Sequence, residues 1–236
     1  MSVEGRLVVI AGATSASGLA AARALIADGA RVVAVGRDEG RLRELEKAVR
    51  SDAGLLTQDA EALRTEVCDL TDEASVTTLA ERVHAADGTI DGVLHLVGGW
   101  RGGGGLAGQS DEDYRFLERS FTALRHVSRA FDADLRASDA GRLAVVSSTA
   151  VTRPLAGGAN YASVKAATEA WTRAVAQGFA KDARDAGKPL AAASVVFRVK
   201  SLSGLEEALA QRFTDLWATP ADETNDTVVE LTDPSL

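Results

Sequence analysis

One serine, one tyrosine and one lysine in the second half of the chain have the types and spacing needed for acid–base chemistry. Tyr161 lies 13 residues after Ser148, and Lys165 follows Tyr161 by four residues. Residues four apart share one face of a helix, so the phenol and the ammonium can lie side by side. A neighbouring cation lowers the pKa of a phenol, which would let Tyr161 donate a proton to a carbonyl or accept one from an alcohol. Ser148, at the end of an apolar run, could hydrogen-bond the same oxygen.

A tyrosine four residues before a lysine is common, and by itself it is more often a surface pair. A second pattern strengthens the interpretation: the small-residue segment 11–20 (AGATSASGLA) follows the first apolar run. A glycine lets the chain turn tightly there, and small side chains allow a diphosphate to approach the backbone at a helix N-terminus. The residues predicted to bind a dinucleotide in this loop are Gly12, Thr14, Ser15, Ser17, Gly18 and Leu19. An ordinary turn without a ligand is the alternative.

The residues after the second apolar run bear on which dinucleotide would bind. Nucleotide-binding folds often place an acid there to hold the ribose hydroxyls of NAD. In this chain the position is Gly36, and Arg37 comes next. Because a guanidinium suits a 2′-phosphate, the sequence favours NADP, with NAD possible. The alternative is that Arg37 is solvated and Asp38 caps the next helix.

The elements that must position these residues alternate between short, Val-rich apolar runs and longer amphipathic segments. The segments predicted as strands are 6–11, 31–35, 63–67, 90–97, 142–146, 190–197 and 227–231. The segments predicted as helices are 17–28, 39–50, 73–86, 112–136, 160–186 and 204–217. Strand, helix and strand repeated in this way predict a doubly wound, Rossmann-type α/β fold. We expect a mostly parallel seven-stranded sheet with helices on both faces, in one domain over residues 1–236.

Composition and charge narrow the classes of function. The 236 residues carry 26 Lys plus Arg against 34 Asp plus Glu, a net charge of −8, which argues against nucleic acid or a membrane surface as partner. The single cysteine, Cys68, excludes an intrachain disulfide, and three scattered histidines predict no metal site. The start of the chain lacks a signal-peptide pattern, and no apolar run approaches the ~20 residues of a membrane span. We expect a cytoplasmic protein.

Taken together, these motifs resemble the short-chain dehydrogenase/reductase family over nearly the whole chain. The segments that carry the resemblance are 11–20 (AGATSASGLA), 35–38 (VGRD), 68–72 (CDLTD), 145–148 (VVSS) and 161–165 (YASVK). Members of that family transfer a hydride between NAD(P) and a carbonyl or alcohol carbon. The resemblance implies that Tyr161 is the acid or base, that Lys165 lowers its pKa and binds the ribose, and that Ser148 bonds the substrate oxygen. It implies an NADP-dependent carbonyl reductase or alcohol dehydrogenase acting on a small molecule.

The resemblance also implies the remaining contacts. The further cofactor-binding residues are Asp69 and Leu70 beside the adenine, together with Val97, Gly98 and Gly99 after the fourth strand. Ser120 aligns with the asparagine that completes the family's catalytic group and could position a water; a register shift by one would place Phe121 there instead. The long segments 112–136 and 160–186 are those through which the family forms homodimers or homotetramers.

Four positions depart from the family pattern and leave other functions as alternatives. They are Ala16 in the phosphate loop, Leu96 after the fourth strand, Ser120, and Arg198 where the family has a Pro-Gly. These departures motivate the alternative of a catalytically weak, nucleotide-binding scaffold. The stretch 97–103 (VGGWRGG) also resembles one in dihydropteridine reductases, which suggests a pterin substrate that could stack on Trp100.

Two further segments could border a substrate. The glycine-rich stretch 98–105 is either a mobile lip over a site or a surface loop without a role. Segment 200–220 occupies the place of a short substrate lid, although core packing explains its helical apolar stripe better than a pocket does. That stripe comprises Leu202, Leu205, Leu209, Phe213 and Trp217. The cations that could meet an anionic substrate if they converge are Arg101, Arg153, Arg198 and Lys200.

Overall fold

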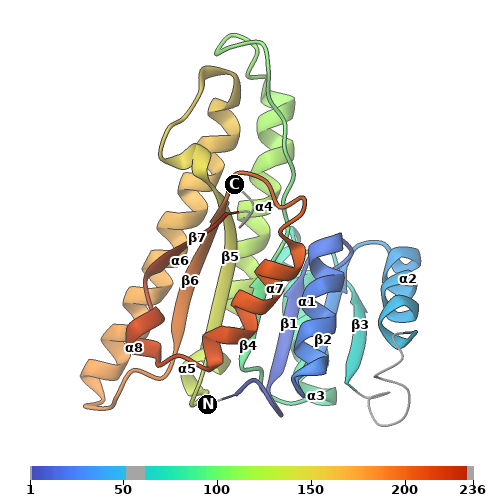
Figure 1. Cartoon of the computed structure of the whole chain (residues 1–236), viewed down its shortest axis with the longest axis vertical. Helices are drawn as coiled ribbons and strands as arrows, with labels where there is room; N and C mark the ends of the chain where they lie inside the picture. Colours follow the sequence, from blue (N-terminus) through green and yellow to red (C-terminus); the bar gives the residue numbers. More distant parts are fainter. Residues whose placement is uncertain (1, 52–61, 233–236) are drawn as a thin grey trace.

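Seven strands form one parallel sheet in the computed structural model, which describes residues 2–51 and 62–232 (Figure 1). The strands are β1 (Leu7–Ala11), β2 (Arg31–Gly36), β3 (Leu63–Val67), β4 (Gly92–His95), β5 (Arg142–Ser148), β6 (Ala193–Val199) and β7 (Thr227–Leu231). Their order is β3-β2-β1-β4-β5-β6-β7, and every neighbouring pair is parallel. The doubly wound prediction is confirmed, and β7 completes the sheet without an antiparallel partner.

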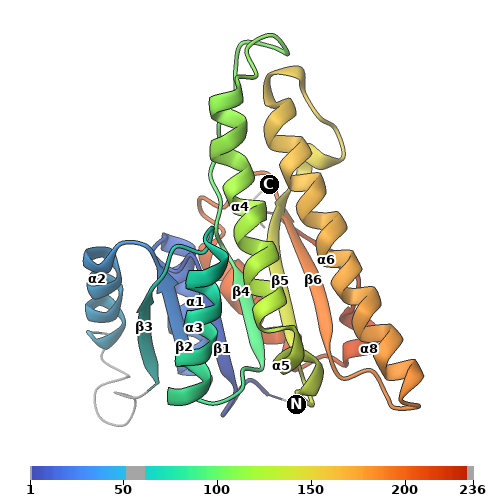
Figure 2. The same ribbon diagram turned by 180° about the vertical axis from the view of Figure 1, so that it is seen from behind.

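Helices cover both faces of the sheet, as the front and back views show (Figures 1 and 2). The helices on one face are α1 (Ala16–Ala27), α2 (Glu39–Arg50) and α7 (Glu206–Thr214). Those on the other face are α3 (Glu73–Ala86), α4 (Asp111–Ala130), α5 (Asp132–Ala137) and α6 (Ala159–Asp185). Central strands are buried on both sides, which explains why they read as continuous apolar runs. No helix in the described ranges is both long and apolar enough for a membrane span.

Short elements complete the chain and lie mostly at its connections. They are the 3₁₀ turns η1 (Thr149–Val151), η2 (Ala156–Gly158) and η3 (Asp215–Trp217), and the short helix α8 (Ala221–Thr224). The amino-terminal ends of α4 and α6 extend past the carboxyl edge of the sheet, where the loops that precede them lie (Figures 1 and 2). Those loops therefore stand beside the edge at which the predicted site residues gather.

Several predicted segments have other bounds in the structure, for example 142–146, which continues to Ser148, and the differences in three segments have identifiable reasons. The segment 112–136 is two helices, because the backbone leaves helical dihedrals at Phe131, whose ring is fully buried and packs edge-on against His84. β4 ends at His95 rather than at residue 97, since the following residues leave the sheet to line a cleft. β6 begins and ends later than predicted, so that Arg198 lies within the strand.

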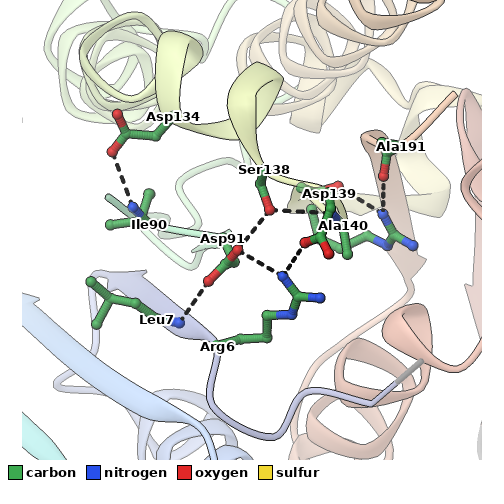
Figure 3. Close-up of polar contacts among 11 residues, drawn as sticks. Arg6, Leu7, Ile90, Asp91, Asp134, Ser138, Asp139, Ala140 and Ala191 are labelled. Atoms are coloured by element: carbon green, nitrogen blue, oxygen red, sulfur yellow. Dashed lines mark hydrogen bonds and ion pairs between the residues drawn. The ribbon is translucent and has the colours of Figure 1, made fainter. Parts of the chain in front are cut away.

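A polar cluster fastens the amino edge of the sheet, opposite the site (Figure 3). The Asp91 carboxylate accepts from the Leu7 N–H at 3.1 Å, from the Ser138 hydroxyl at 2.6 Å and from Arg6 at 3.1 Å. Arg6 also pairs with Asp139. Because these contacts join β1, β4 and the end of α5, they fix the central strands on which the site is built.

The same edge carries a fully buried arginine. Arg142 donates hydrogen bonds to the carbonyl oxygens of Leu216, Gly141 and Ala191 at 2.8–2.9 Å, and to that of Thr219 at 3.2 Å. These bonds tie β5 to the segment after α7. The apolar stripe of segment 200–220 faces the core there, so its prediction as core packing is confirmed: Leu205, Leu209, Phe213 and Trp217 are buried, with Leu202 packed against them.

Candidate active site

The turn from β1 into α1 is closed tightly enough to need glycine. Gly12 has a φ of +87°, and a Cβ on it would lie 2.9 Å from the Val97 backbone nitrogen. A Cβ on Gly18 would lie 2.0 Å from the Ala13 carbonyl oxygen, so the helix packs directly against the turn. The first turn of α1 carries no acidic side chain, which leaves the positive end of the helix dipole open to an anion. The loop therefore fits a cofactor that bears a diphosphate.

The predicted loop residues divide into those that face the cleft and those that hold the turn. Thr14, Ser15 and Ser17 line cavities above the carboxyl edge of the sheet. Gly18 donates its N–H to the Ser15 hydroxyl at 3.1 Å, and Leu19 donates its N–H to the Ser15 carbonyl at 3.0 Å. The Leu19 side chain packs against the core. Gly18 and Leu19 therefore shape the turn, with their N–H groups already bonded inside the helix.

One cavity, of about 260 Å³, extends from this turn toward the ends of β2 and β3. Arg37 and Arg41 border it, and Arg119 reaches it from α4. Arg41 donates to the Thr14 carbonyl oxygen at 2.7 Å, while Asp38 caps α2 by accepting from the Arg41 N–H at 2.9 Å. Three guanidinium groups thus surround one end of the cleft.

Two of the predicted adenine neighbours lie in the same cavity. Asp69 and Leu70 both line it. Hydrogen bonds from the Thr71 hydroxyl and N–H hold the pKa of Asp69 below its usual range, with smaller contributions from Arg119 and Arg37. Asp69 is therefore a fixed anion at neutral pH, and it accepts hydrogen bonds at the end of β3.

A second cavity, of about 510 Å³, continues from the first along the carboxyl edge. The residues that line both are Ser15, Leu96, Val97 and Gly98. Gly99, Tyr161 and Lys165 line the second cavity only. The structure therefore brings the predicted reacting pair and the predicted phosphate loop to one continuous cleft.

Ser148 lies close enough to Tyr161 to affect the pKa of the phenol, and its hydroxyl accepts from the Ala150 N–H at 3.2 Å. A hydrogen bond with Ser148 lowers the pKa of Tyr161, but burial raises it by more, so the net direction is upward. The Lys165 nitrogen lies 5.8 Å from the centre of the tyrosine ring. Burial decides the net direction, and the lowering predicted from the Lys165 ammonium is not seen in the pKa of Tyr161. Tyr161 is a protonated phenol at neutral pH.

Lys165 is held inside the protein by β5. Its amine donates to the Val146 carbonyl oxygen at 2.7 Å, and the side chain is almost fully buried. Burial lowers the pKa of Lys165 to about 8, against an opposing contribution from the Glu169 carboxylate. The amine thus changes charge close to neutral pH, far below the usual range of a lysine.

Ser120 lies in the cleft wall, so the register that places Ser120 rather than Phe121 there is the one observed. Its hydroxyl donates to the Leu117 carbonyl oxygen at 2.7 Å, and its own carbonyl accepts from His95 Nε2 at 3.0 Å. Phe121 instead packs edge-on against Trp171. The sequence gives no sign of His95, which stands at the end of β4 with its Nδ1 buried and unpaired.

A family model described as short chain dehydrogenase matches residues 6–183. The chain belongs to this family. A protein named as a ketoacyl reductase of the monensin polyketide synthase from Streptomyces virginiae is 30% identical over 227 residues, 95% of this chain and 80% of that protein. The 3-oxoacyl-(acyl-carrier-protein) reductase FabG of Salmonella typhimurium is 25% identical over 178 residues, 75% of this chain and 68% of its own.

A solved structure of L-sorbose reductase from Gluconobacter frateurii, complexed with NADPH and L-sorbose, superimposes with a TM-score of 0.81. It is 19% identical, and the match covers 98% of this chain and 96% of that one. At this identity the likeness shows the fold alone. The chain is thus an oxidoreductase-family protein with the complete Rossmann-type sheet of a short-chain dehydrogenase.

The glycine-rich stretch 98–105 of this short-chain dehydrogenase is held in place by hydrogen bonds. Gln109 donates to the carbonyl oxygens of Gly103 and Gly157 at 3.0 Å and accepts from the Asn160 N–H at 3.2 Å. Gly103 also donates its N–H to the Gly157 carbonyl at 2.7 Å. This stretch is therefore docked onto the segment that leads into α6. Its residues Gly99 and Trp100 border the second cavity.

The cations predicted to converge on a substrate do not form one group. Arg198 is nearly buried and binds Glu169, and Arg101 lies over the Phe116 ring at 4.1 Å. Lys200, by contrast, lines the second cavity together with Ser201 and Ser203. The residues in the cleft walls that the motifs did not single out are His95, Phe116, Arg119, Arg41, Ser201 and Ser203. Arg41 lies in the first turn of α2, and no spacing in the sequence indicates that it reaches the cleft.

Proposed function

We propose that this short-chain dehydrogenase is an NADP-dependent oxidoreductase that reduces a small carbonyl substrate at Ser148, Tyr161 and Lys165. One observation carries the proposal. Tyr161 and Lys165 line a cavity that runs, through shared walls, into an arginine-bordered cleft at the start of α1. A nicotinamide dinucleotide needs both parts, because its phosphates and its reacting ring lie at opposite ends of one extended molecule.

The proposed chemistry assigns one role to each side chain. When bound, the cofactor supplies the hydride. Tyr161 donates its proton to the substrate oxygen, and the raised pKa of its phenol keeps that proton in place at neutral pH. The Ser148 hydroxyl, at the carboxyl end of β5, is proposed to hold the same oxygen. Lys165, fixed on the Val146 carbonyl, places a positive charge that stabilises negative charge developing on the tyrosine oxygen.

Preference for NADP over NAD rests on the arginines at the far end of the cleft. Arg37 and Arg41 border the cavity, and a guanidinium binds a phosphate through paired, charge-assisted hydrogen bonds. Titration of the parent protein should give a lower Kd for NADPH than for NADH. In Arg37→Ser the NADPH Kd should rise about tenfold or more, with little change for NADH, since a charged hydrogen bond contributes about 1.5–3 kcal/mol.

Arg43→Ser is the matched control for this titration. Arg43 lies on α2, which begins two residues after Arg37, but it is exposed, pairs with Glu39 at 2.7 Å and is not part of the cavity wall. The control should bind NADPH as the parent does. Equal NADPH and NADH affinities in the parent would contradict the NADP assignment and favour a cofactor without the 2′-phosphate.

The substrate class is tested by a panel of carbonyl compounds. The ketoacyl reductase relatives suggest a β-ketoacyl thioester, and a ketose and a quinonoid dihydropterin represent the other candidates. Consumption of NADPH with one of them supports an oxidoreductase. The nucleotide-binding scaffold, motivated by Ala16, Leu96, Ser120 and Arg198, predicts NADPH binding without consumption across the panel.

The quaternary structure and the lid are further parts of the proposal. We propose a homodimer or homotetramer that uses the two long helical segments 112–136 and 160–186, and light scattering should give the mass of two or four chains. Segment 200–220 is proposed to contact substrate only through residues 200–206, since Lys200, Ser203 and Glu206 line the cavity while the rest of α7 packs on α1.

A further inference from the structure

A buried ion pair lies directly behind the proposed acid–base site. Glu169 follows Lys165 by one helical turn on α6, and the residue is only 8% exposed. Its carboxylate accepts from Arg198 Nε at 3.1 Å and from Arg198 Nη2 at 2.8 Å. The Ser147 hydroxyl donates to the same carboxylate at 2.6 Å. These three bonds join α6 to β5 and β6.

Neighbouring residues of β5 hold the lysine and the glutamate. The Val146 carbonyl accepts from the Lys165 amine, and the Ser147 hydroxyl donates to Glu169. The amine and the carboxylate are therefore fixed relative to one strand and to each other. Because both lie in the interior, their electrostatic interaction is screened far less than that of a surface pair.

We propose that Glu169, held by Arg198 and Ser147, is a positioning residue that sets the charge of the Lys165 amine. This role of Glu169 matters for catalysis only if Lys165 acts as in the proposed function, on which the inference rests. A carboxylate bound in a bidentate manner by a guanidinium stays ionised when buried. That anion stabilises the ammonium form of Lys165, which burial alone would disfavour. Arg198, which takes the place of the family's Pro-Gly, thereby acquires a role.

The other groups that face Lys165 come from each element packed around it. His95 of β4 is neutral near neutral pH because burial lowers its pKa to about 4, and the Lys165 amine lies 5.8 Å from the centre of the Tyr161 ring of α6. Lys200 and Glu206, in the segment after β6, line the same cavity as Lys165. Behind Glu169, Arg198 also approaches Glu230 of β7 at 3.5 Å. Glu169 is the anion that lies one helical turn from Lys165 and opposes the effect of burial on its pKa, whereas Glu206 lies on the cavity wall and Glu230 pairs with Arg198.

The charge of Lys165 can be measured directly in the protein without cofactor. The chain contains only five lysines, namely Lys47, Lys165, Lys181, Lys188 and Lys200. Protein labelled with ¹³C-lysine should give five resolved sets of side-chain signals, and Lys165→Arg identifies the one that belongs to Lys165. Titration of that signal with pH gives its pKa in the parent and in each variant.

In Glu169→Gln the Lys165 pKa should fall by about one pH unit or more, as expected when an opposite charge at close range is removed. The double variant Glu169→Met with Arg198→Met removes both charges and keeps the site filled, so it covers the case in which the single variant fails to fold. Its Lys165 pKa should lie between those of Glu169→Gln and the parent, because the nearer anion outweighs the farther cation.

Glu230→Gln is the matched control, since it removes an exposed carboxylate that shares Arg198 but does not adjoin Lys165. It should leave the Lys165 pKa at the parent value. An unchanged Lys165 pKa in both Glu169 variants, or an equal shift in Glu230→Gln, would overturn the proposal. A shift seen by NMR in a protein that consumes no NADPH would refute the proposed function and leave this inference standing.

Activity gives a second readout if a substrate is found. The pH at which kcat declines on the alkaline side should move down in Glu169→Gln with the NMR value, while KM changes less. A uniform loss of kcat at every pH, without movement of the profile, would mark Glu169 as merely structural and overturn the proposal.

Discussion

The buried His95 makes the stability of this protein sensitive to mild acid. His95 is 4% exposed, and its Nε2 donates to the Ser120 carbonyl while Nδ1 has no partner. Burial lowers the pKa of His95 to about 4, with a smaller lowering by Lys165, against an opposing contribution from the bond to Ser120. The folded protein therefore keeps this ring neutral at a pH where an unfolded chain would protonate it.

The size of the effect follows from the two pKa values. The pKa falls from 6.5 to about 4 on folding, so the unfolded chain binds an extra proton between these values. Stability is then full above about pH 6.5 and declines as the pH falls toward about 4. At 1.36 kcal/mol for each pH unit, the loss is about 2 kcal/mol at about pH 5 and about 3 kcal/mol when complete.

His95→Gln isolates this contribution, because glutamine can donate to the Ser120 carbonyl and does not titrate. Urea unfolding of parent and variant should be measured at about pH 7 and about pH 5, so that losses from other groups cancel in the difference. The parent should lose about 2 kcal/mol more than the variant over this range. An equal loss in both proteins would refute the reasoning and mean that His95 is protonated, or hydrated, in the folded state.

Two substitutions at the amino edge of the sheet test the packing there. A Cβ on Gly92 would lie 2.8 Å from the Trp217 ring, so Gly92→Ala should lower the free energy of unfolding by about 1–3 kcal/mol, and a variant as stable as the parent would contradict this packing. Arg142→Leu removes the guanidinium donor from the Leu216, Ala191 and Thr219 carbonyl groups, while the Gly141 carbonyl keeps the Ala193 N–H, and it should cost at least about 3 kcal/mol in denaturant unfolding. Unchanged stability would show that water replaces the guanidinium.

The fold and the location of the site could be predicted because they depend on local patterns. Valine-rich runs separated by amphipathic segments allow few arrangements other than a doubly wound sheet. In such a sheet, residues that follow strands meet at the carboxyl edge. The order and spacing of Tyr161, Lys165 and the loop at Gly12 predict that they lie along that edge, where they line two adjoining cavities; Ser148 ends β5 there but lines neither cavity.

What could not be predicted depends on burial and on contacts between distant elements. The spacing of Tyr161 and Lys165 predicts their proximity, but the sign of the tyrosine pKa shift is decided by burial. Arg198 and Glu169 are 29 residues apart and meet only because α6 packs on β6. An isolated arginine in the sequence gives no indication of such a partner. The sequence therefore does not distinguish an arginine that faces a substrate from one that forms a buried ion pair.

The helix break at Phe131 and the binding of the glycine-rich stretch by Gln109 are also features that the sequence could not predict. A glycine run has many conformations available, and its sequence favours a loose loop. Gln109 supplies hydrogen bonds to that run and to residues preceding α6, which are 48 or more positions away. Such contacts follow from the assembled fold and not from the local sequence.

Transfer of deuterium from 4-deuterated NADPH to the carbonyl carbon of a panel substrate tests the central proposal most directly. The parent should place the label on the product alcohol in a single stereochemical position. Tyr161→Phe should bind NADPH with a similar Kd and transfer the label at least about 10²-fold more slowly, because the proton donor is gone. Transfer by Tyr161→Phe at the parent rate would contradict the assignment of Tyr161 as the acid.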